Sequence, residues 1–385
     1  MQANITLRGM TWSDPRGYDP LVAAVTAFQK KRPDVSIQWD KRSLQEFEST
    51  PVQDLAANYD LLVIDHPHVG TIVKQNCLIP MGDIVEDDVL LDLASQSVGR
   101  SFESYHYQGH QWALPLDAAA QVQAYRPDRL DTPVRSWTDV VTLAEDGKVI
   151  WPLRPPHVLM AFFTLMGNIG APCGVQSGNF AETRSAHQVL NAMQALYDAV
   201  DPTCSLMDPI AALDALADSP KLALSPLTYL YKGYANIGYR PNRIAFSDIP
   251  VLGKSGPLGS ALGGTGIAVS ANTAHPKLCG AFSQWVAGGH IQSTLYAQSN
   301  GQPGHAAAWN DASVNEPVGD AYFKTRMTHE AAWLRPRHDG YMGFQEEGSE
   351  IFADILAGKA TKASGLSALK LRFDSSFNPF DRDAT

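Results

Sequence analysis

Groups that can recognise a small molecule lie close together near the start of the chain, in the segment NITLRGMTWSDPRGYDP. Trp12 offers a flat, polarisable face on which a pyranose or another flat ring can stack; alternatively, it is a core side chain that anchors its loop. The planar guanidinium of Arg16 suits a carboxylate. Asp14 and Pro15 can form the turn that starts a helix. This chemistry is that of binding, and it requires a strand that brings these residues to an edge open to ligand.

A second set of polar groups follows later apolar segments. Asp65 and His66 end the segment LLVIDH, where the imidazole can donate to and accept from hydroxyl groups and Asp65 can instead cap a helix. Asp117 follows LPL, where its carboxylate can bind two vicinal hydroxyls or can form a capping or hinge hydrogen bond. His66 and His68 are separated by one proline, and no second cluster of Cys and His accompanies them. No metal site is therefore predicted.

The motifs that would indicate catalysis or a nucleotide cofactor are absent or broken. Gly253-Lys254-Ser255 resembles the end of a phosphate loop, but Asp248 stands where the first glycine belongs and Pro250 stiffens the loop. The glycine cluster at 263–266 lacks the dinucleotide-binding spacing and precedes a predicted strand instead of a helix. Neither G-x-S-x-G nor H-E-x-x-H occurs. The sequence therefore predicts no enzyme and no cofactor.

Strands and helices must alternate along the chain to position these residues. Strands are predicted for residues 5–9, 34–39, 61–64, 222–226 and 267–270, and extended segments for 112–116 and 121–125 on either side of a connection. Helices are predicted for residues 21–32, 137–144, 183–200, 276–288 and 291–299, with two more between 344 and 373. This alternation is typical of βαβ units in an α/β protein, whose ligands bind at the carboxyl ends of the strands.

Length and composition exclude several classes of protein. A chain of 385 residues is too long for one ordinary hydrophobic core, so two domains are predicted. Hydrophobic residues make up 44% and charged residues 18%, which is normal for a soluble globular protein. The net charge of −10, with no cluster of Lys and Arg to offset it, argues against a nucleic acid partner. No apolar stretch approaches the roughly 20 residues of a membrane-spanning helix.

The N-terminus and the cysteines bear on the cellular compartment. A predicted strand begins within a few residues of Met1, so the protein is expected either to be cytoplasmic or to have lost a secretory signal. Cys77, Cys173, Cys204 and Cys279 form no C-x-x-C pair. Cys173 and Cys204 flank one predicted helix and could pair in an oxidising compartment; four buried thiols are the alternative.

In the order and spacing of its motifs, the chain resembles the extracellular solute-binding proteins of ABC importers, the family that includes sugar- and maltodextrin-binding proteins. The resemblance extends over nearly the whole chain. It rests on ITLRGMTW with YDPLVAAVTAFQKKRPDVSIQW, YDLLVIDHPHV with LIPMGDIV, HQWALPLDAAAQVQAYRPDRLDTPVRSWTDV, and LGGTGIAVSANTAHPKLCGAFSQWVAGGHIQSTLYAQSNGQPG. Two stretches depart from the family pattern: Arg126 follows Tyr125 where the family usually has Asn, and LSPLTYLYKGY replaces a glycine-rich segment.

The resemblance implies a type II periplasmic-binding-protein fold, in which two α/β lobes are joined by crossing strands and hold ligand in the cleft between them. Residues 1–115 and 263–308 are expected to form the first lobe, and residues 116–262 and 309–385 the second, with the C-terminal helices. Hinge closure would capture a small solute and deliver it to a membrane permease. The expected partners are that solute and the permease's transmembrane subunits, and the protein is expected to be a periplasmic monomer whose signal peptide has been removed.

The resemblance also widens the expected binding site. Glycines at 263–266 would let the backbone approach a ligand and flex at the hinge. The ligand-binding residues expected in all are Trp12, Arg16, Asp65, His66, Asp117, Ser225, Thr228, Tyr229, Gly264, Thr265, Arg337 and Tyr341. The expected solute is a sugar or a sugar derivative. The alternatives are a small organic acid bound by Arg16, His66 or Arg337, and an enzyme on the same two-lobe fold.

Overall fold

The computed structural model describes residues 5–378, apart from the side chains of Gln45, Glu48 and Ser49. The chain divides into two compact units: Met1–Ala118 with Gly263–Asn315 form unit 1, and Ala119–Leu262 with Glu316–Thr385 form unit 2. The polypeptide therefore passes three times from one unit to the other. Strands β7 (Leu114–Tyr125) and β10 (Leu262–Ser270) contain the first two of these passages.

Unit 1 is built on a sheet whose central strands are parallel. β1 (Ile5–Trp12) pairs in parallel with both β2 (Val35–Arg42) and β3 (Leu61–Ile64), whereas β10 pairs with β3 in the antiparallel direction. In the β1–β2 ladder, Trp12 lies opposite Arg42. The carboxyl ends of these strands therefore meet at one edge of the sheet.

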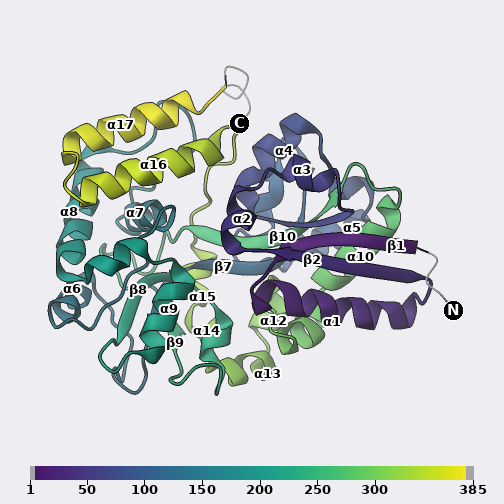
Figure 1. Cartoon of the computed structure of the whole chain (residues 1–385), viewed down its shortest axis with the longest axis horizontal. Coiled ribbons are helices and arrows are strands. Elements are labelled where there is room, and N and C mark those ends of the chain that lie inside the picture. Colours follow the sequence, from purple (N-terminus) through teal and green to yellow (C-terminus); the bar gives the residue numbers. More distant parts are fainter. Residues whose placement is uncertain (1–4, 379–385) are drawn as a thin grey trace. The chain divides into compact units, whose positions relative to one another are not determined.

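Helices cover both faces of the unit 1 sheet. In Figure 1, α2, α3 and α4 lie on one side of β1 and β2, and α1 and α12 lie on the other. Phe28 of α1 packs edge-on against Phe282 of α10, with ring centres 5.3 Å apart. The helices of this unit are α1 (Pro15–Lys31), α2 (Leu44–Ser49), α3 (Val52–Ala56), α4 (Val69–Gln75), α5 (Asp87–Ser95), α10 (Pro276–Ala287), α11 (Gly289–Ile291), α12 (Ala306–Trp309) and α13 (Ala312–Asn315). The short strands are β4 (Leu78–Ile79), β5 (His106–Tyr107) and β6 (His110–Gln111).

The start of α1 is fixed by its cap. The Asp14 side chain accepts a hydrogen bond from the Arg16 backbone N–H at 2.8 Å, and Pro15 occupies a first-turn position that needs no donor. The turn-forming role considered for Asp14 and Pro15 is thereby confirmed. The helix begins six residues before the start predicted from apolar spacing, so Arg16 belongs to its first turn.

Unit 2 has a smaller antiparallel sheet and a larger share of helix. The second half of β7 pairs with β8 (Leu224–Tyr229) and with β9 (Ala245–Ser247). Figure 1 shows α16 and α17 running side by side, and Phe352 of α16 meets Phe162 of α7 with ring centres 4.7 Å apart. The helices are α6 (Trp137–Glu145), α7 (His157–Asn168), α8 (Thr183–Ala199), α9 (Pro209–Asp218), α14 (Ala321–Lys324), α15 (Arg326–Glu330), α16 (Tyr341–Leu356) and α17 (Lys362–Ser375).

Several predicted elements are corrected by the structure. The two extended segments at 112–116 and 121–125 are largely one strand, β7, whose residues are all buried. The glycines at 263–266 lie inside β10 and not ahead of it. Helix α7 escaped prediction because it is buried on every side and so lacks an amphipathic period. The strand predicted for residues 61–64 is confirmed as β3.

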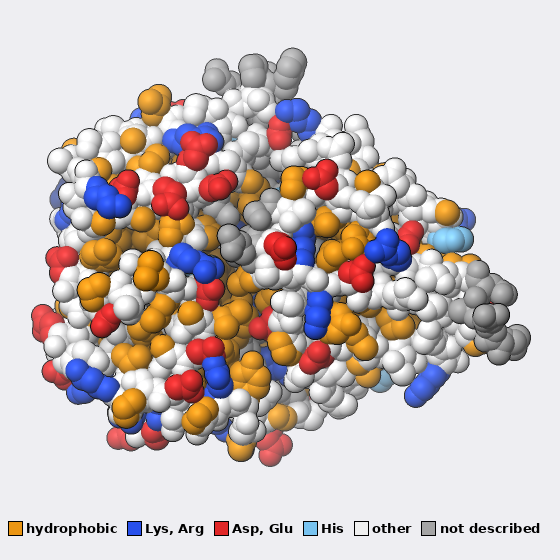
Figure 2. Space-filling view, in the orientation of Figure 1, with side chains coloured by type: hydrophobic (Ala, Val, Ile, Leu, Met, Phe, Trp, Pro, Cys, Tyr) orange, Lys and Arg blue, Asp and Glu red, His pale blue; other side chains and the backbone are white. Residues whose placement is uncertain are grey.

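The surface and the cysteines complete the description. On the face drawn in Figure 2, acidic and basic side chains are interspersed and do not gather by sign. None of the helices within residues 5–378 combines the length and apolar character needed to cross a membrane. All four cysteines are buried free thiols, so the possible bond between Cys173 and Cys204 is not formed.

Candidate solute-binding site

Trp12, the last residue of β1, lies at the carboxyl edge of the unit 1 sheet. Its indole is 6.0 Å from the Phe47 ring, and the Arg16 guanidinium lies 5.6 Å from its centre. A Cβ added to Gly17 would come within 2.0 Å of the indole Nε1, so α1 can approach the indole this closely only with glycine there. Trp12 is 3% exposed, whereas a more open position was expected. Its stacking against a solute stays a prediction.

Arg16 and Asp117, which are 101 residues apart in sequence, form a bidentate ion pair inside unit 1. Arg16 Nε donates to one carboxylate oxygen of Asp117 and Nη2 donates to the other, each at a distance of 2.5 Å. The side chains of Arg16 and Asp117 are 7% and 3% exposed. Burial raises the pKa of the Asp117 carboxyl, and the guanidinium opposes that shift. Two predicted ligand contacts thus bind each other. A solute carboxylate at Arg16 would have to compete with Asp117.

Asp65 and His66 lie together directly after β3. Asp65 accepts a hydrogen bond from the His66 backbone N–H at 2.8 Å, and its carboxylate lies 3.1 Å from His66 Nδ1. Asp65 therefore has the capping role considered for it, at the short turn His66–His68. The His66 ring is fully buried and lies edge-on to Tyr105, with ring centres 6.3 Å apart. A solute contact for either residue stays a prediction, and no group of His, Cys, Asp and Glu in the described part of the chain could hold a metal ion.

Gly264 and Thr265 are strand residues of β10. Gly264 has a φ of 102°, a backbone conformation that favours glycine, and Thr265 is buried. An added Cβ on the neighbouring Gly266 would lie 2.8 Å from the Tyr105 ring. Backbone conformation and close packing therefore explain two of these glycines within unit 1, and the hinge role stays a prediction.

In unit 2, strand β8 carries two fully buried hydroxyl groups. A bulge pairs Ser225 with Ala124 and Thr228 with Val122, so three steps along β8 match two along β7 and both hydroxyls lie on one face. Among the described residues, neither Ser225 Oγ nor Thr228 Oγ1 has a hydrogen-bond partner. A buried polar group left without a partner costs about 1–3 kcal/mol. The hydroxyl groups of Ser225 and Thr228, both predicted site residues, can therefore still form hydrogen bonds.

His157, which the sequence analysis did not single out, stands at the start of α7 next to the predicted site residue Tyr229. The two rings meet edge-on with centres 6.4 Å apart. His157 is 4% exposed, and neither ring nitrogen has a hydrogen-bond partner among the residues described. The signal in the sequence was Pro156, because a proline fits at the start of a helix, and the residue after it then lies in the first turn.

The imidazole of His157 is neutral. Burial lowers its pKa to about 4, an effect that the nearby Asp208 carboxylate only partly offsets. A neutral imidazole has one donor nitrogen and one acceptor nitrogen. It can therefore bind a group that both donates and accepts, as an alcohol does.

Acid is expected to destabilise the protein through His157. Its pKa of about 4 in the folded state lies below the unfolded value of about 6.5. The contribution of the neutral imidazole to the free energy of unfolding is therefore complete above pH 6.5 and is lost as pH falls through 4. The loss should approach about 3 kcal/mol, measured by urea unfolding at pH 7 and pH 4. His157→Gln should reduce this pH dependence, and His290→Gln, at an exposed site, should not. An unchanged pH profile in His157→Gln would contradict the assignment.

Tyr341 and Arg337 lie at the start of α16 in unit 2. Tyr341 is fully buried, with its ring 5.9 Å from that of His338 and 6.0 Å from that of Phe344. The preceding Arg335 donates to Leu262 O and Gln345 Oε1, both at 3.1 Å. Arg337 is partly exposed. The solute contacts predicted for Arg337 and Tyr341 stay predictions.

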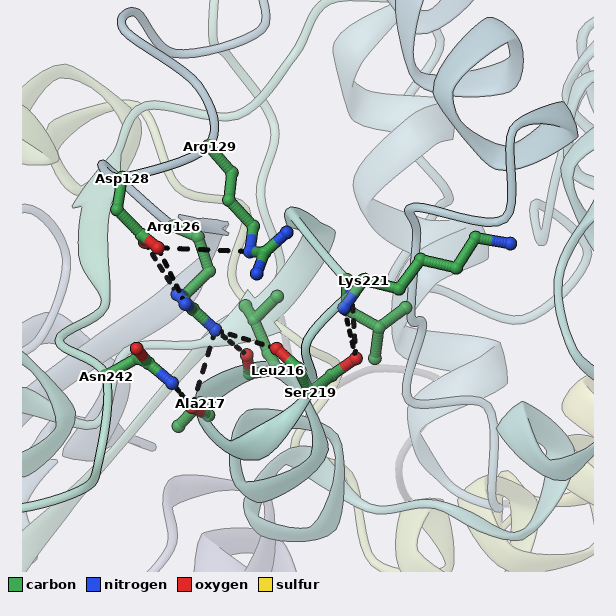
Figure 3. A network of polar contacts seen from close by, with 9 residues as sticks. Arg126, Asp128, Arg129, Leu216, Ala217, Ser219, Lys221 and Asn242 are labelled. Atoms are coloured by element: carbon green, nitrogen blue, oxygen red, sulfur yellow. Dashed lines mark hydrogen bonds and ion pairs between the residues drawn. The ribbon is translucent and has the colours of Figure 1, made fainter.

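Arg126, where the chain departs from the family pattern, has a structural role in unit 2. Figure 3 shows its guanidinium between the Asp128 carboxylate and the carboxyl end of α9. It donates to both carboxylate oxygens at 2.8 Å and to the carbonyls of Leu216 and Ser219 at 3.1 Å. The side chain is 2% exposed. These contacts supply donors to carbonyl oxygens at the end of α9 that have no hydrogen-bond partner within the helix. The presence of Arg126 in place of the family's usual residue therefore does not itself indicate a different ligand.

Comparison with known proteins supports the fold. A maltose-bound MalE3 of T. maritima matches with a TM-score of 0.82 at 14% identity, over 96% of this chain and 99% of that one. An ABC transporter solute-binding protein of Agrobacterium radiobacter K84, solved with ribitol, matches with a TM-score of 0.80 at 18% identity, over 97% of this chain and 99% of that one. The GacH receptor of Streptomyces glaucescens GLA.O, solved unliganded and with acarbose, matches with a TM-score of 0.78 at 14% identity, over 98% of this chain and 99% of that one. The two-lobe fold class is thereby confirmed.

The family assignment comes from sequence. No curated protein matches the chain. The family model described as bacterial extracellular solute-binding protein matches residues 23–318, more than half of the chain. The chain therefore belongs to the family of bacterial extracellular solute-binding proteins.

Proposed function

We propose that the protein is the solute-binding component of an ABC importer and that it captures a sugar or a sugar derivative. Membership of an extracellular solute-binding family supports the binding role. Proteins of the same fold have been solved with maltose, ribitol and D-mannitol. The observation that carries the solute class is His157, a buried neutral imidazole whose two nitrogens match the donor and acceptor capacity of hydroxyl groups.

Other groups in each unit fit the same class of solute. In unit 1, the Trp12 indole has the flat apolar face that a sugar ring prefers, and the adjacent Arg16–Asp117 pair is neutral overall. In unit 2, Ser225 and Thr228 add hydroxyls that can donate and accept. Closure of the two units on a bound solute would exclude water and strengthen each polar contact. The permease would then distinguish closed protein from open protein.

A panel of solutes tests this proposal. Maltose, ribitol, mannitol, common hexoses and pentoses, and small organic acids would each be added to the purified protein and its melting temperature recorded. A solute at about a hundred times its Kd should add about 2.7 kcal/mol to the free energy of unfolding. The solute that stabilises should also reduce the radius of gyration in small-angle scattering and be recovered chemically unchanged. Stabilisation by organic acids alone, or conversion of the solute, would contradict the proposal.

Trp12→Leu is expected to weaken binding of that solute about tenfold, because leucine keeps apolar bulk but lacks the ring face. Isothermal titration of the folded variant gives the affinity, and urea unfolding gives the stability. Trp39→Leu is the matched control, because Trp39 is also buried in unit 1 but packs on the α10 side, 6.5 Å from Phe282. The control should lose stability while its affinity is unchanged. Equal affinities in the two variants would make Trp12 a core residue only.

A further inference from the structure

At the carboxyl end of β2, Arg42 is a buried cation. The residue is 9% exposed, and neither Nε nor Nη1 has a hydrogen-bond partner among the residues described. Burial lowers the pKa of its guanidinium to about 10, which leaves it protonated at neutral pH. Burying a charged group without paired acceptors is unfavourable. Nε and Nη1 therefore have donor capacity that no described residue uses, although the Glu46 carboxylate acts on the charge from nearby.

Two described acidic side chains close to Arg42 in sequence, Glu46 and Asp40, accept hydrogen bonds from other groups. Glu46 accepts hydrogen bonds from the backbone N–H and the hydroxyl of Ser43, at 2.8 and 2.9 Å, in a capping box at the start of α2. Asp40, two residues earlier in β2, accepts from Arg8 at 2.8 Å and from the Tyr59 hydroxyl at 3.0 Å. Arg8 therefore has a carboxylate partner, as Arg16 has in Asp117.

Arg42 belongs to the same cluster of side chains as Trp12. The two residues lie opposite each other in the β1–β2 ladder. The Phe47 ring contacts both, 5.3 Å from the Arg42 guanidinium and 6.0 Å from the indole. A solute that stacks on Trp12 would therefore have a substituent close to the Arg42 guanidinium.

From this geometry we propose that Arg42 binds an acidic group of the solute, which makes the solute an acidic sugar such as a uronic acid. The proposal rests on the proposed function, since it assumes that a sugar binds beside Trp12. A carboxylate accepts charge-assisted hydrogen bonds from a guanidinium and neutralises it. A hydroxyl of a neutral sugar could accept a hydrogen bond but would add no negative charge beside the buried guanidinium.

Matched pairs of neutral and acidic sugars test the proposal: glucose with glucuronate, galactose with galacturonate, and sorbitol with gluconate. Isothermal titration would compare wild type, Arg42→Gln and Arg42→Lys. In wild type, at least one acid should bind about ten- to a hundredfold more tightly than its neutral partner. Arg42→Gln should remove this preference by weakening the acid alone, and Arg42→Lys should keep part of it. Arg8→Gln is the control, because it removes an equal charge from the half-exposed Arg8–Asp40 pair and should leave the preference unchanged.

The outcomes separate this proposal from the proposed function. Equal binding of acid and neutral sugar by wild type, or an acid preference that survives in Arg42→Gln, overturns the role of Arg42 and leaves sugar capture in place. Binding of no sugar, polyol or sugar acid overturns both. If Arg42→Gln fails to fold, Arg42→Lys decides: an acid preference equal to that of wild type at low and at high salt counts against a direct contact, and a smaller preference supports one.

Discussion

Asp117→Ala is expected to lower the free energy of unfolding by about 3–5 kcal/mol, because it leaves the Arg16 guanidinium buried without its partner. Arg16 and Asp117 are each less than a tenth exposed, so water cannot replace the lost carboxylate without opening the structure. Urea unfolding followed by circular dichroism measures the change. A loss below about 1 kcal/mol, typical of an exposed ion pair, would contradict the buried pair.

The double variant Arg16→Met with Asp117→Leu separates stability from binding. Replacing both charges by apolar side chains of similar size should recover most of the stability, because a buried ion pair and an apolar pair are often nearly equal in free energy. If Asp117 or Arg16 contacts the solute, the double variant should bind the solute more weakly than wild type does. Recovery of both stability and affinity would make the pair purely structural.

Arg126→Met is expected to lower the free energy of unfolding by about 3–5 kcal/mol through loss of the donors at the end of α9. Methionine can fill much of the volume but cannot donate to the carbonyls of Leu216 and Ser219, which lie at the helix end shown in Figure 3. Urea unfolding measures the loss.

Arg129→Met is the matched control for Arg126. Arg129 also faces Asp128, but at 3.9 Å and with a side chain 32% exposed, so its replacement should change stability by less than about 1 kcal/mol. Solute affinity should be the same in both variants, since neither residue is placed in the binding site. Weaker binding by folded Arg126→Met would contradict the structural assignment and indicate a role of Arg126 in binding the solute.

The sequence by itself determined the α/β class, the family and many of the elements. Residues 61–64 were predicted correctly because a continuous apolar run between aspartates is typical of a buried parallel strand. Helices such as α8 and α10 were predicted to within a residue because one apolar face gives them a clear period. The capping role of Asp14 was also legible, because a cap acts between residues that are close in sequence.

The tertiary structure decided how the charged groups are used. The guanidinium of Arg16 was predicted to suit a carboxylate, and the carboxylate it binds in the structure is Asp117, 101 residues away, a separation over which local spacing carries no information. His157 escaped notice because α7 is buried on all sides, so the sequence shows no face on which one polar residue stands out. Nothing in the sequence around Arg42 indicates that it is buried; the packing of α2 and Phe47 on the sheet makes it so. Burial and long-range pairing set the free energy of a charge, and both depend on residues that only folding brings together.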